Sequence, residues 1–154
     1  MSTADRRRVD VVIPTHDAAD LLEQCLSHLR DESIARVVVV DDRSSDDTVQ
    51  RLTGRPGVDV VELKEDRGLA HAFNRGVERG RSPYVLFLNN DIFPAPGAVD
   101  RLVAALEASP SAGSAAGRLV DPDSGTTQQS YQPRDIPGAL AILVRLVGVE
   151  RYWR

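Results

Sequence analysis

The chain has 154 residues, which suits one domain with a sizeable core, and its composition of 42% hydrophobic and 27% charged residues is typical of globular proteins. The net charge of −4 argues against a nucleic-acid-binding surface. The single cysteine, Cys25, excludes a disulfide within the chain and fits a reducing compartment.

Strand and helix patterns alternate along the first two thirds of the sequence. The expected strands are short runs rich in β-branched residues, at 9–13, 37–40, 58–63 and 84–88. The expected helices are amphipathic segments at 18–29, 44–52, 69–79 and 98–108, the second of them capped by Ser44 or Ser45. This alternation predicts right-handed βαβ units, a mostly parallel sheet and a three-layer α/β/α fold.

The pattern weakens after about residue 110. Residues 113–120 are a candidate fifth strand, residues 121–133 a loop or short hairpin, and residues 136–149 an apolar helix too short to span a bilayer. We expect a disordered N-terminus over 1–8, a domain over 9–121, and a loop with an apolar helix over 122–154.

Arginines gather near both ends of the chain. They are Arg6, Arg7, Arg8, Arg145, Arg151 and Arg154. Solvated termini are the simpler interpretation, and contact with an anionic membrane surface is the alternative. The N-terminus shows no signal peptide, so the expected location is the cytoplasm, with the inner face of the membrane as a further option.

Polar and acidic residues directly follow three of the expected strands, at 14–17, 41–44 and 89–91. In open parallel sheets, ligands bind at the carboxyl ends of the strands, so these residues are expected to gather at one edge. A nucleotide sugar would suit them, because carboxylates accept hydrogen bonds from the base and ribose. A hard cation, Mg²⁺ or Mn²⁺, held by a carboxylate such as Asp91, would offset the diphosphate charge.

Three blocks of sequence resemble the family 2 glycosyltransferases of the GT-A fold. Residues 11–29 resemble the opening strand and helix, and residues 37–48 (VVVVDDRSSDDT) resemble the second strand with its acidic pair. Residues 66–94 are similar to the Gly-x-x-x-Ala-x-Asn-x-Gly helix and the strand with the metal motif. The LNND ending is most similar to the branch that includes rhamnosyl- and galactofuranosyltransferases of bacterial cell-surface glycans.

The resemblance implies a nucleotide-sugar site built from residues of all three blocks. Pro14 and Thr15 would line the nucleoside pocket, and Asp41 or Asp42 would accept a hydrogen bond from the base. The residues alone leave that choice open. His16, in the first of these loops, is a further candidate for ligand contact.

The third block would supply the remaining site residues. Gly68 would let the chain pass close to the nucleotide, and Asn74 would hold its helix in place, although a tight turn and an ordinary surface position are the simpler roles. Asn90 takes the ribose-side position of the DxD-type motif and Asp91 the metal position. Asn89 stands where the family often has aspartate.

The implied activity is inverting, metal-assisted transfer from a UDP- or dTDP-sugar to a glycan or lipid-linked acceptor, in cell wall or polysaccharide biosynthesis. The family's general base follows the metal motif, and no acidic residue after Asp91 sits in a comparable context, so the catalytic residue is unassigned and the chain resembles a truncated, donor-binding half. Self-association or peripheral membrane contact through 136–149 is a further expectation.

Two other interpretations compete with an active transferase. The first is a non-catalytic nucleotide-sugar-binding module that needs a partner chain. The second is an unrelated doubly wound module, such as a receiver or a dinucleotide-binding domain. Pro14 and Thr15 after the first strand, and the lack of a G-x-G-x-x-G motif there, disfavour this second interpretation.

Overall fold

The computed structural model describes residues 7–65, 67–121 and 123–128. The chain divides into two compact units, Met1–Ala115 and Ala116–Arg154. Strands and helices alternate in the described part of the first unit. In chain order they are β1 (Val9–Thr15), α2 (Ala19–His28), β2 (Ile34–Asp41), α3 (Thr48–Leu52), β3 (Val58–Glu62), α4 (Leu69–Val77), β4 (Tyr84–Phe87) and α5 (Ala98–Ala108).

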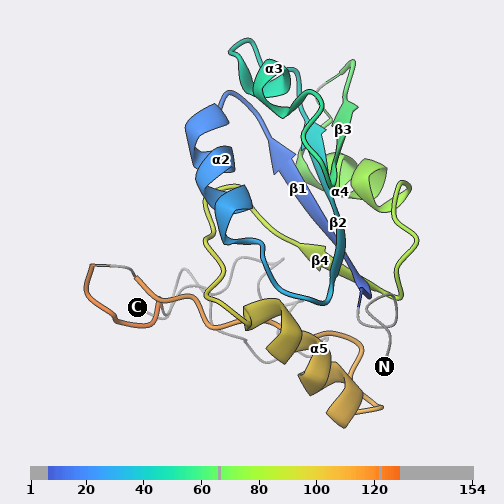
Figure 1. Cartoon of the computed structure of the whole chain (residues 1–154), viewed down its shortest axis with the longest axis vertical. Helices are drawn as coiled ribbons and strands as arrows, with labels where there is room; N and C mark the ends of the chain where they lie inside the picture. Colours follow the sequence, from blue (N-terminus) through green and yellow to red (C-terminus); the bar gives the residue numbers. More distant parts are fainter. Residues whose placement is uncertain (1–6, 66, 122, 129–154) are drawn as a thin grey trace, which may run out of the picture. The chain divides into compact units, whose positions relative to one another are not determined.

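The four strands form one parallel sheet in the order β3-β2-β1-β4 (Figure 1). The chain steps outward from β1 to β2 and β3 and then crosses to the other side of β1 to form β4. Open α/β sheets bind their ligands in the crevice outside the carboxyl ends of the strands at such a reversal of strand order, which here falls between β1 and β4. The register pairs Thr15 with Asp41, so β1 and β2 end side by side.

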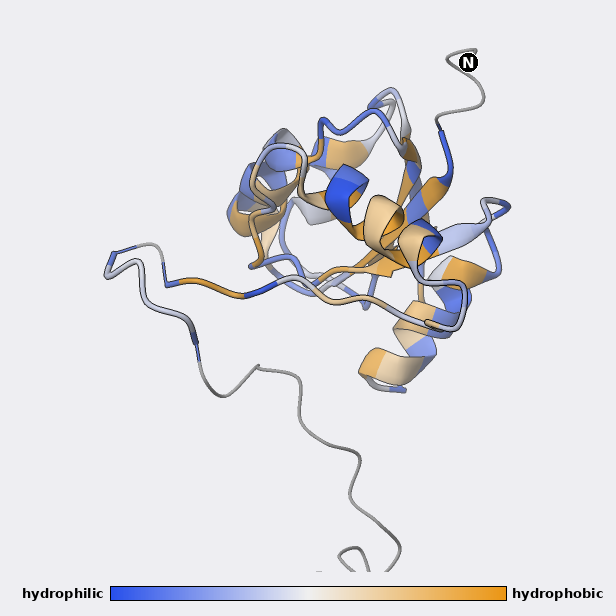
Figure 2. Ribbon diagram, turned by 90° about the horizontal axis from the view of Figure 1, so that it is seen from below, coloured by the Kyte–Doolittle hydropathy of each residue, from blue (hydrophilic) through white to orange (hydrophobic). Residues whose placement is uncertain are grey.

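The side chains of the central strands alternate between two apolar layers, because successive strand residues point to opposite faces. Val11, Ile13 and Val39 pack with buried residues of α2 and α5 on one face of the sheet. Val12, Val38 and Val40 pack with Ala72 of α4 on the other face. The apolar residues therefore gather in the strands, as the hydropathy colouring shows (Figure 2), and the sheet is covered on both sides.

The helix α4 approaches the sheet closely because Gly76 lacks a side chain. A Cβ atom at Gly76 would stand 2.2 Å from Cγ1 of Val12 and 3.0 Å from Cγ2 of Val40. A real Cβ atom cannot occupy that space without moving the helix or the strand. Gly76 is thus required by packing.

Asp10 in β1 is a fully buried carboxylate that fixes the start of β4. It accepts hydrogen bonds from the amides of Arg81 (2.5 Å) and Ser82 (2.8 Å) and from the Ser82 hydroxyl (2.8 Å). The Arg36 guanidinium lies 3.4 Å away. Burial acts to raise the pKa of Asp10, but the bonds from Ser82 and Arg81 and the charge of Arg36 outweigh it, and the pKa lies below its usual value.

The expected strands and helices are confirmed in order and type, with two corrections. The second helix begins at Thr48 and not at Ser44, and neither serine caps it, because both are bonded to Asp17 across the sheet edge. The expected strand at 113–120 is wrong: within the described residues, only Val120 pairs, through one antiparallel bridge to Thr127.

The described residues of the second unit form a short reversal of the chain. The Asp121 amide donates to the Thr126 carbonyl (2.9 Å), and Asp121 Oδ1 accepts from the Ser124 amide (2.8 Å). The expected apolar helix at 136–149 lies outside the described residues. Among the helices that the structure describes, none has the length and apolar character needed to cross a membrane.

Candidate functional site

Hydrogen bonds join the loops that follow β1, β2 and β4 into a continuous row. The Asp42 amide donates to the Thr15 carbonyl at 2.8 Å. The Asn90 side-chain amide donates to Thr15 Oγ1 at 3.2 Å. The three sequence blocks thus meet at the crevice between the carboxyl ends of β1 and β4, with Thr15 at the centre of the row.

The two carboxylates of the acidic pair have different surroundings. Asp41 ends β2 and is 3% exposed, and its Oδ2 accepts from the Ser44 amide at 3.1 Å. Its Oδ1 is buried and has no hydrogen-bond partner among the described residues. A buried carboxylate oxygen without a donor is costly, so Asp41 has an acceptor atom that a ligand N–H group could satisfy. Asp42 is half-buried, and its carbonyl oxygen lies 2.7 Å from His16 Nδ1.

Asp17 locks the loop after β1 to the loop after β2. Its Oδ1 accepts from the amides of Ser45 (2.5 Å) and Asp46 (3.2 Å), while its own amide donates to Ser44 Oγ (2.9 Å). The bond from the Ser45 amide is the main cause that holds the pKa of Asp17 below its usual value. Sequence patterns gave no signal for this contact, because the bonded residues are 27 to 29 positions apart.

The turn after β4 presents Asp91 to solvent. The Ile92 amide donates to the Asn89 carbonyl at 3.2 Å and closes the turn. Behind it, burial and the nearby Asp91 charge raise the pKa of Cys25 to about 11. That thiol is buried in the core and is protonated at neutral pH.

The donor set fits a hard divalent cation that is bound together with a phosphate ligand. The described residues contain no group of three or more histidine, cysteine, aspartate or glutamate side chains that could hold a metal by themselves. A Mg²⁺-like ion, however, commonly uses one or two carboxylates and takes its other ligands from phosphate and water. Asp91 supplies one exposed carboxylate, and Asn90, whose amide nitrogen bonds Thr15, can offer its amide oxygen.

The other predicted residues lie in the places that the sequence suggested. Pro14 is buried with Thr15 at the end of β1. Gly68 precedes α4 with φ of 80°, a left-handed conformation that favours glycine. Asn74 lies within α4 and is exposed. Among the described residues, the Asn74 side chain makes no hydrogen bond to Thr15 or Asn90.

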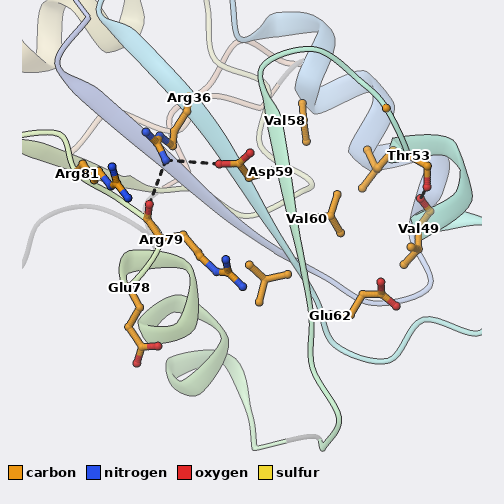
Figure 3. A pocket seen from close by; sticks show the side chains of 13 residues that line it. Arg36, Val49, Thr53, Val58, Asp59, Val60, Glu62, Glu78, Arg79 and Arg81 are labelled. Carbon is orange, nitrogen blue, oxygen red and sulfur yellow. Dashed lines mark hydrogen bonds and ion pairs between the residues drawn. The ribbon is translucent and has the colours of Figure 1, made fainter.

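One groove in the described part lies elsewhere, along the outer edge of β3. It has a volume of about 650 Å³ and is lined by β3, by α3 and by the residues that follow α4. Arg36 crosses it, with ion-pair contact to Asp59 (3.5 Å) and a hydrogen bond to the Arg79 carbonyl (3.1 Å) (Figure 3). Acidic and basic side chains are mixed there, so the groove lacks the uniform charge that a phosphate ligand would need.

A family model described as glycosyl transferase family 2 matches residues 10–146. The chain belongs to this family. The family match overturns the interpretation as a receiver or dinucleotide-binding module. It agrees with the site geometry, since the three resembling blocks are the ones whose loops meet at Thr15.

Relatives and solved structures extend this finding. The succinoglycan biosynthesis protein ExoU of Rhizobium meliloti is 36% identical over 110 residues, which is 67% of this chain and 32% of ExoU. The mannosyltransferase PcManGT of Pyrobaculum calidifontis, solved with GDP-Man and Mn²⁺, superposes with a TM-score of 0.58 at 30% identity, over 68% of this chain and 34% of that one.

A third match is glucosyl-3-phosphoglycerate synthase of Mycobacterium tuberculosis, solved with Mn²⁺ and UDP, with a TM-score of 0.55 at 26% identity, over 68% of this chain and 41% of that one. These structures confirm the expected GT-A type of α/β fold. The chain spans about a third of the length of two curated relatives it matches, 35% of one and 32% of the other.

The acidic residues after Asp91 that the structure describes serve local contacts. Asp100 accepts from the Ser33 amide at 3.0 Å, and Glu107 pairs with Arg8. Asp121 closes its own turn, and Asp123 is exposed beside it. Asp135 and Glu150 lie outside the described residues. The general base therefore stays unassigned within the described residues.

Proposed function

We propose that this chain binds a nucleotide-diphosphate sugar at the crevice beyond β1 and β4 and forms the donor site of a glycosyltransferase. The observation that carries the proposal is the row from Asp42 through Thr15 to Asn90, with Asp91 exposed at its end. The row would supply hydrogen-bond acceptors for the base and the ribose, followed by a carboxylate for a cation. A nucleotide diphosphate has its base, ribose and phosphates in the same order.

The nucleoside would lie over the end of β2, with Pro14 and Thr15 beside it. Base N–H groups need acceptors, and the buried Oδ1 of Asp41 lacks a donor within the described residues. Asp41 is therefore one proposed acceptor for the base, and Asp42, which follows it directly, is the other. Asn90, which is already oriented by Thr15, would contact the ribose, and Gly68 would allow the chain to pass close to the nucleotide before α4.

Asp91, assisted by Asn90, would hold a Mg²⁺ or Mn²⁺ ion. When bound, such an ion stabilises the negative charge that develops on the departing nucleoside diphosphate. The protein's own contribution is to orient the nucleotide through the base, ribose and backbone contacts of the row.

The donor is proposed to be a UDP- or dTDP-sugar, and the acceptor a glycan or lipid-linked saccharide of a cell-surface polysaccharide. The LNND sequence supports a donor of the rhamnosyl or galactofuranosyl type. PcManGT was solved with GDP-Man, so GDP is the natural competitor in a test of base preference. Transfer with inversion would require a general base that takes the proton of the acceptor hydroxyl.

A second function is a binding module that holds the nucleotide sugar for a partner chain. The contacts of Asp100 and Glu107 favour it, because these carboxylates serve the packing of α5 and do not line the crevice row. The two functions share the donor site and differ in whether sugar is transferred.

Calorimetric titration of UDP, dTDP and GDP, with and without Mn²⁺, tests the donor site. We expect binding of UDP or dTDP that strengthens with Mn²⁺, and Asp91→Ala should remove the metal dependence. Asp59→Ala is the matched control, since it removes an exposed carboxylate from the groove along β3 and should bind as the wild type does. Failure of the wild type to bind all three nucleotides would refute the proposal.

A further inference from the structure

Arg43 occupies a backbone conformation that its side chain does not favour. It follows the acidic pair directly and has φ of 63°. Among the described residues, Asp17 (φ 45°) is the other non-glycine residue with positive φ. Aspartate tolerates this conformation because its short side chain can bond locally, whereas arginine has no such compensation. Backbone strain of this kind is concentrated at functional sites, so Arg43 is a candidate for a functional role.

The edge of the sheet that carries the row is strongly acidic, and its other arginines are engaged. Arg51 bonds Asp47 (2.9 Å) and Asp20 (2.8 Å). Arg67 bonds Glu65 at 3.0 and 2.7 Å. Arg43 is exposed and makes no hydrogen bond or ion pair with any described residue. Unlike Arg51 and Arg67, Arg43 therefore has a guanidinium that is available to a ligand.

The position of Arg43 places it beside the crevice. Its neighbour Asp42 donates its amide to Thr15, and Thr15 in turn accepts from Asn90. Lys64 is the other exposed cation that follows a strand at this edge, but it follows β3, which lies one strand further from β4. Of the two, Arg43 follows the strand that lies nearer to β4 in the sheet.

We propose that the Arg43 guanidinium pairs with the phosphate groups of the bound nucleotide. A guanidinium forms charge-assisted, often bidentate hydrogen bonds with phosphate oxygens. Such a pair offsets the repulsion between a diphosphate and the surrounding carboxylates of Asp41, Asp42 and Asp91. It also explains why arginine stands at a position whose backbone favours glycine. This inference rests on the proposed donor site.

The test compares UDP with uridine, which has the same base and ribose and no phosphate. Binding is measured by NMR titration for the wild type, Arg43→Gly, Arg43→Lys and the control Lys64→Ala. We expect Arg43→Gly to weaken UDP binding about tenfold and to leave uridine binding unchanged. Arg43→Lys, which keeps the charge, should retain part of the affinity, and Lys64→Ala should bind both ligands as the wild type does.

Thermal unfolding of the same variants separates a contact role from a structural one. Glycine suits the left-handed conformation, so Arg43→Gly should melt at the wild-type temperature or above it. The inference is overturned if Arg43→Gly leaves UDP binding unchanged, weakens UDP and uridine binding equally, or lowers the melting temperature. It is also overturned if Lys64→Ala weakens UDP binding as much as Arg43→Gly does. If the wild type binds neither ligand, the proposed donor site fails and takes this inference with it.

Discussion

Asp10 is a buried carboxylate in the inner strand β1, and its hydrogen-bond and charge partners compensate for the cost of burying it. Its carboxylate accepts three hydrogen bonds from Arg81 and Ser82 and faces Arg36. The sequence placed Asp10 inside a buried strand without indicating these partners, which lie more than 70 positions away in the loop before β4. The hydrogen-bond partners of a buried group that lie far away in the sequence cannot be predicted from the residues next to it.

Replacing Asp10 with asparagine should lower stability in a pH-dependent way. At pH 7 the amide group would face donors in place of the carboxylate, which costs about 2–4 kcal/mol of unfolding free energy. The folded-state pKa of Asp10 lies below its unfolded value of about 3.9, so its contribution is present above about pH 4 and is lost as pH falls toward the lowered pKa.

Urea unfolding of the wild type and Asp10→Asn at pH 7 and pH 3 measures this effect. The gap in unfolding free energy between the two proteins should narrow at pH 3. An equal difference in unfolding free energy at pH 7 and pH 3 would mean that the charge of the Asp10 carboxylate does not stabilise the fold. Asp59→Asn, an exposed carboxylate that also contacts Arg36, serves as the control and should change stability little.

The candidate site shows the same division between local and long-range information. Thr15, Asp41, Asp42 and Asn90 were predicted because each follows a strand, and parallel strands end at one edge. The bonds that link them through Thr15, and the difference in burial between Asp41 and Asp42, required the folded structure. Asp17 and Arg43 lie in the stretches 14–17 and 41–44 that were expected at this edge, but no individual role was predicted for either residue, since backbone strain leaves no mark in a sequence.

At the scale of elements, the position of α4 depends on one glycine. Gly76→Ala would drive a Cβ atom into Val12, and we expect a loss of about 1–3 kcal/mol in unfolding free energy. Gly113→Ala is the control, because a Cβ atom at Gly113 would meet nothing within 4 Å. Chemical denaturation measures both. Equal stability of the two variants would contradict the packing described for α4.

A double substitution tests whether the loss comes from that contact. Val12→Ala removes the methyl groups that a Cβ atom at Gly76 would strike. The double variant Val12→Ala, Gly76→Ala should therefore be more stable than the sum of the two single losses predicts. Strict additivity would show that the alanine at 76 acts through the helix backbone and not through the sheet.

The elements themselves were largely predictable, with two informative exceptions. Amphipathic periods and β-branched runs placed all four strands and four helices of the first unit that the structure describes. The start of α3 was misplaced because Ser44 and Ser45 resemble helix caps in sequence but are bonded to Asp17. Residues 113–120 likewise have a strand-like sequence pattern, but among the described residues only Val120 pairs, through one bridge to Thr127.

At the scale of the molecule, several large apolar side chains stay exposed within the first unit. Val85 and Phe87 of β4 are 36% and 55% exposed, and Phe87 contacts Phe73 of α4 with ring centroids 5.0 Å apart. Exposed apolar surface on an edge strand favours association. We expect concentration-dependent self-association that Phe87→Ser reduces, measured by sedimentation velocity. A wild type that stays monomeric across the concentration series would contradict this.

The central claim is that three loops, 14–17, 41–45 and 89–91, form one nucleotide site at the carboxyl edge of the sheet. Backbone amide shifts on titration of the ¹⁵N-labelled protein with UDP and Mg²⁺, followed by replacement with Mn²⁺, test it most directly. We expect the largest shifts to fall in all three loops, and we expect Mn²⁺ to broaden the signals of residues 89–92 first. Shifts confined to the groove of Arg36 and Asp59, or none at all, would contradict it.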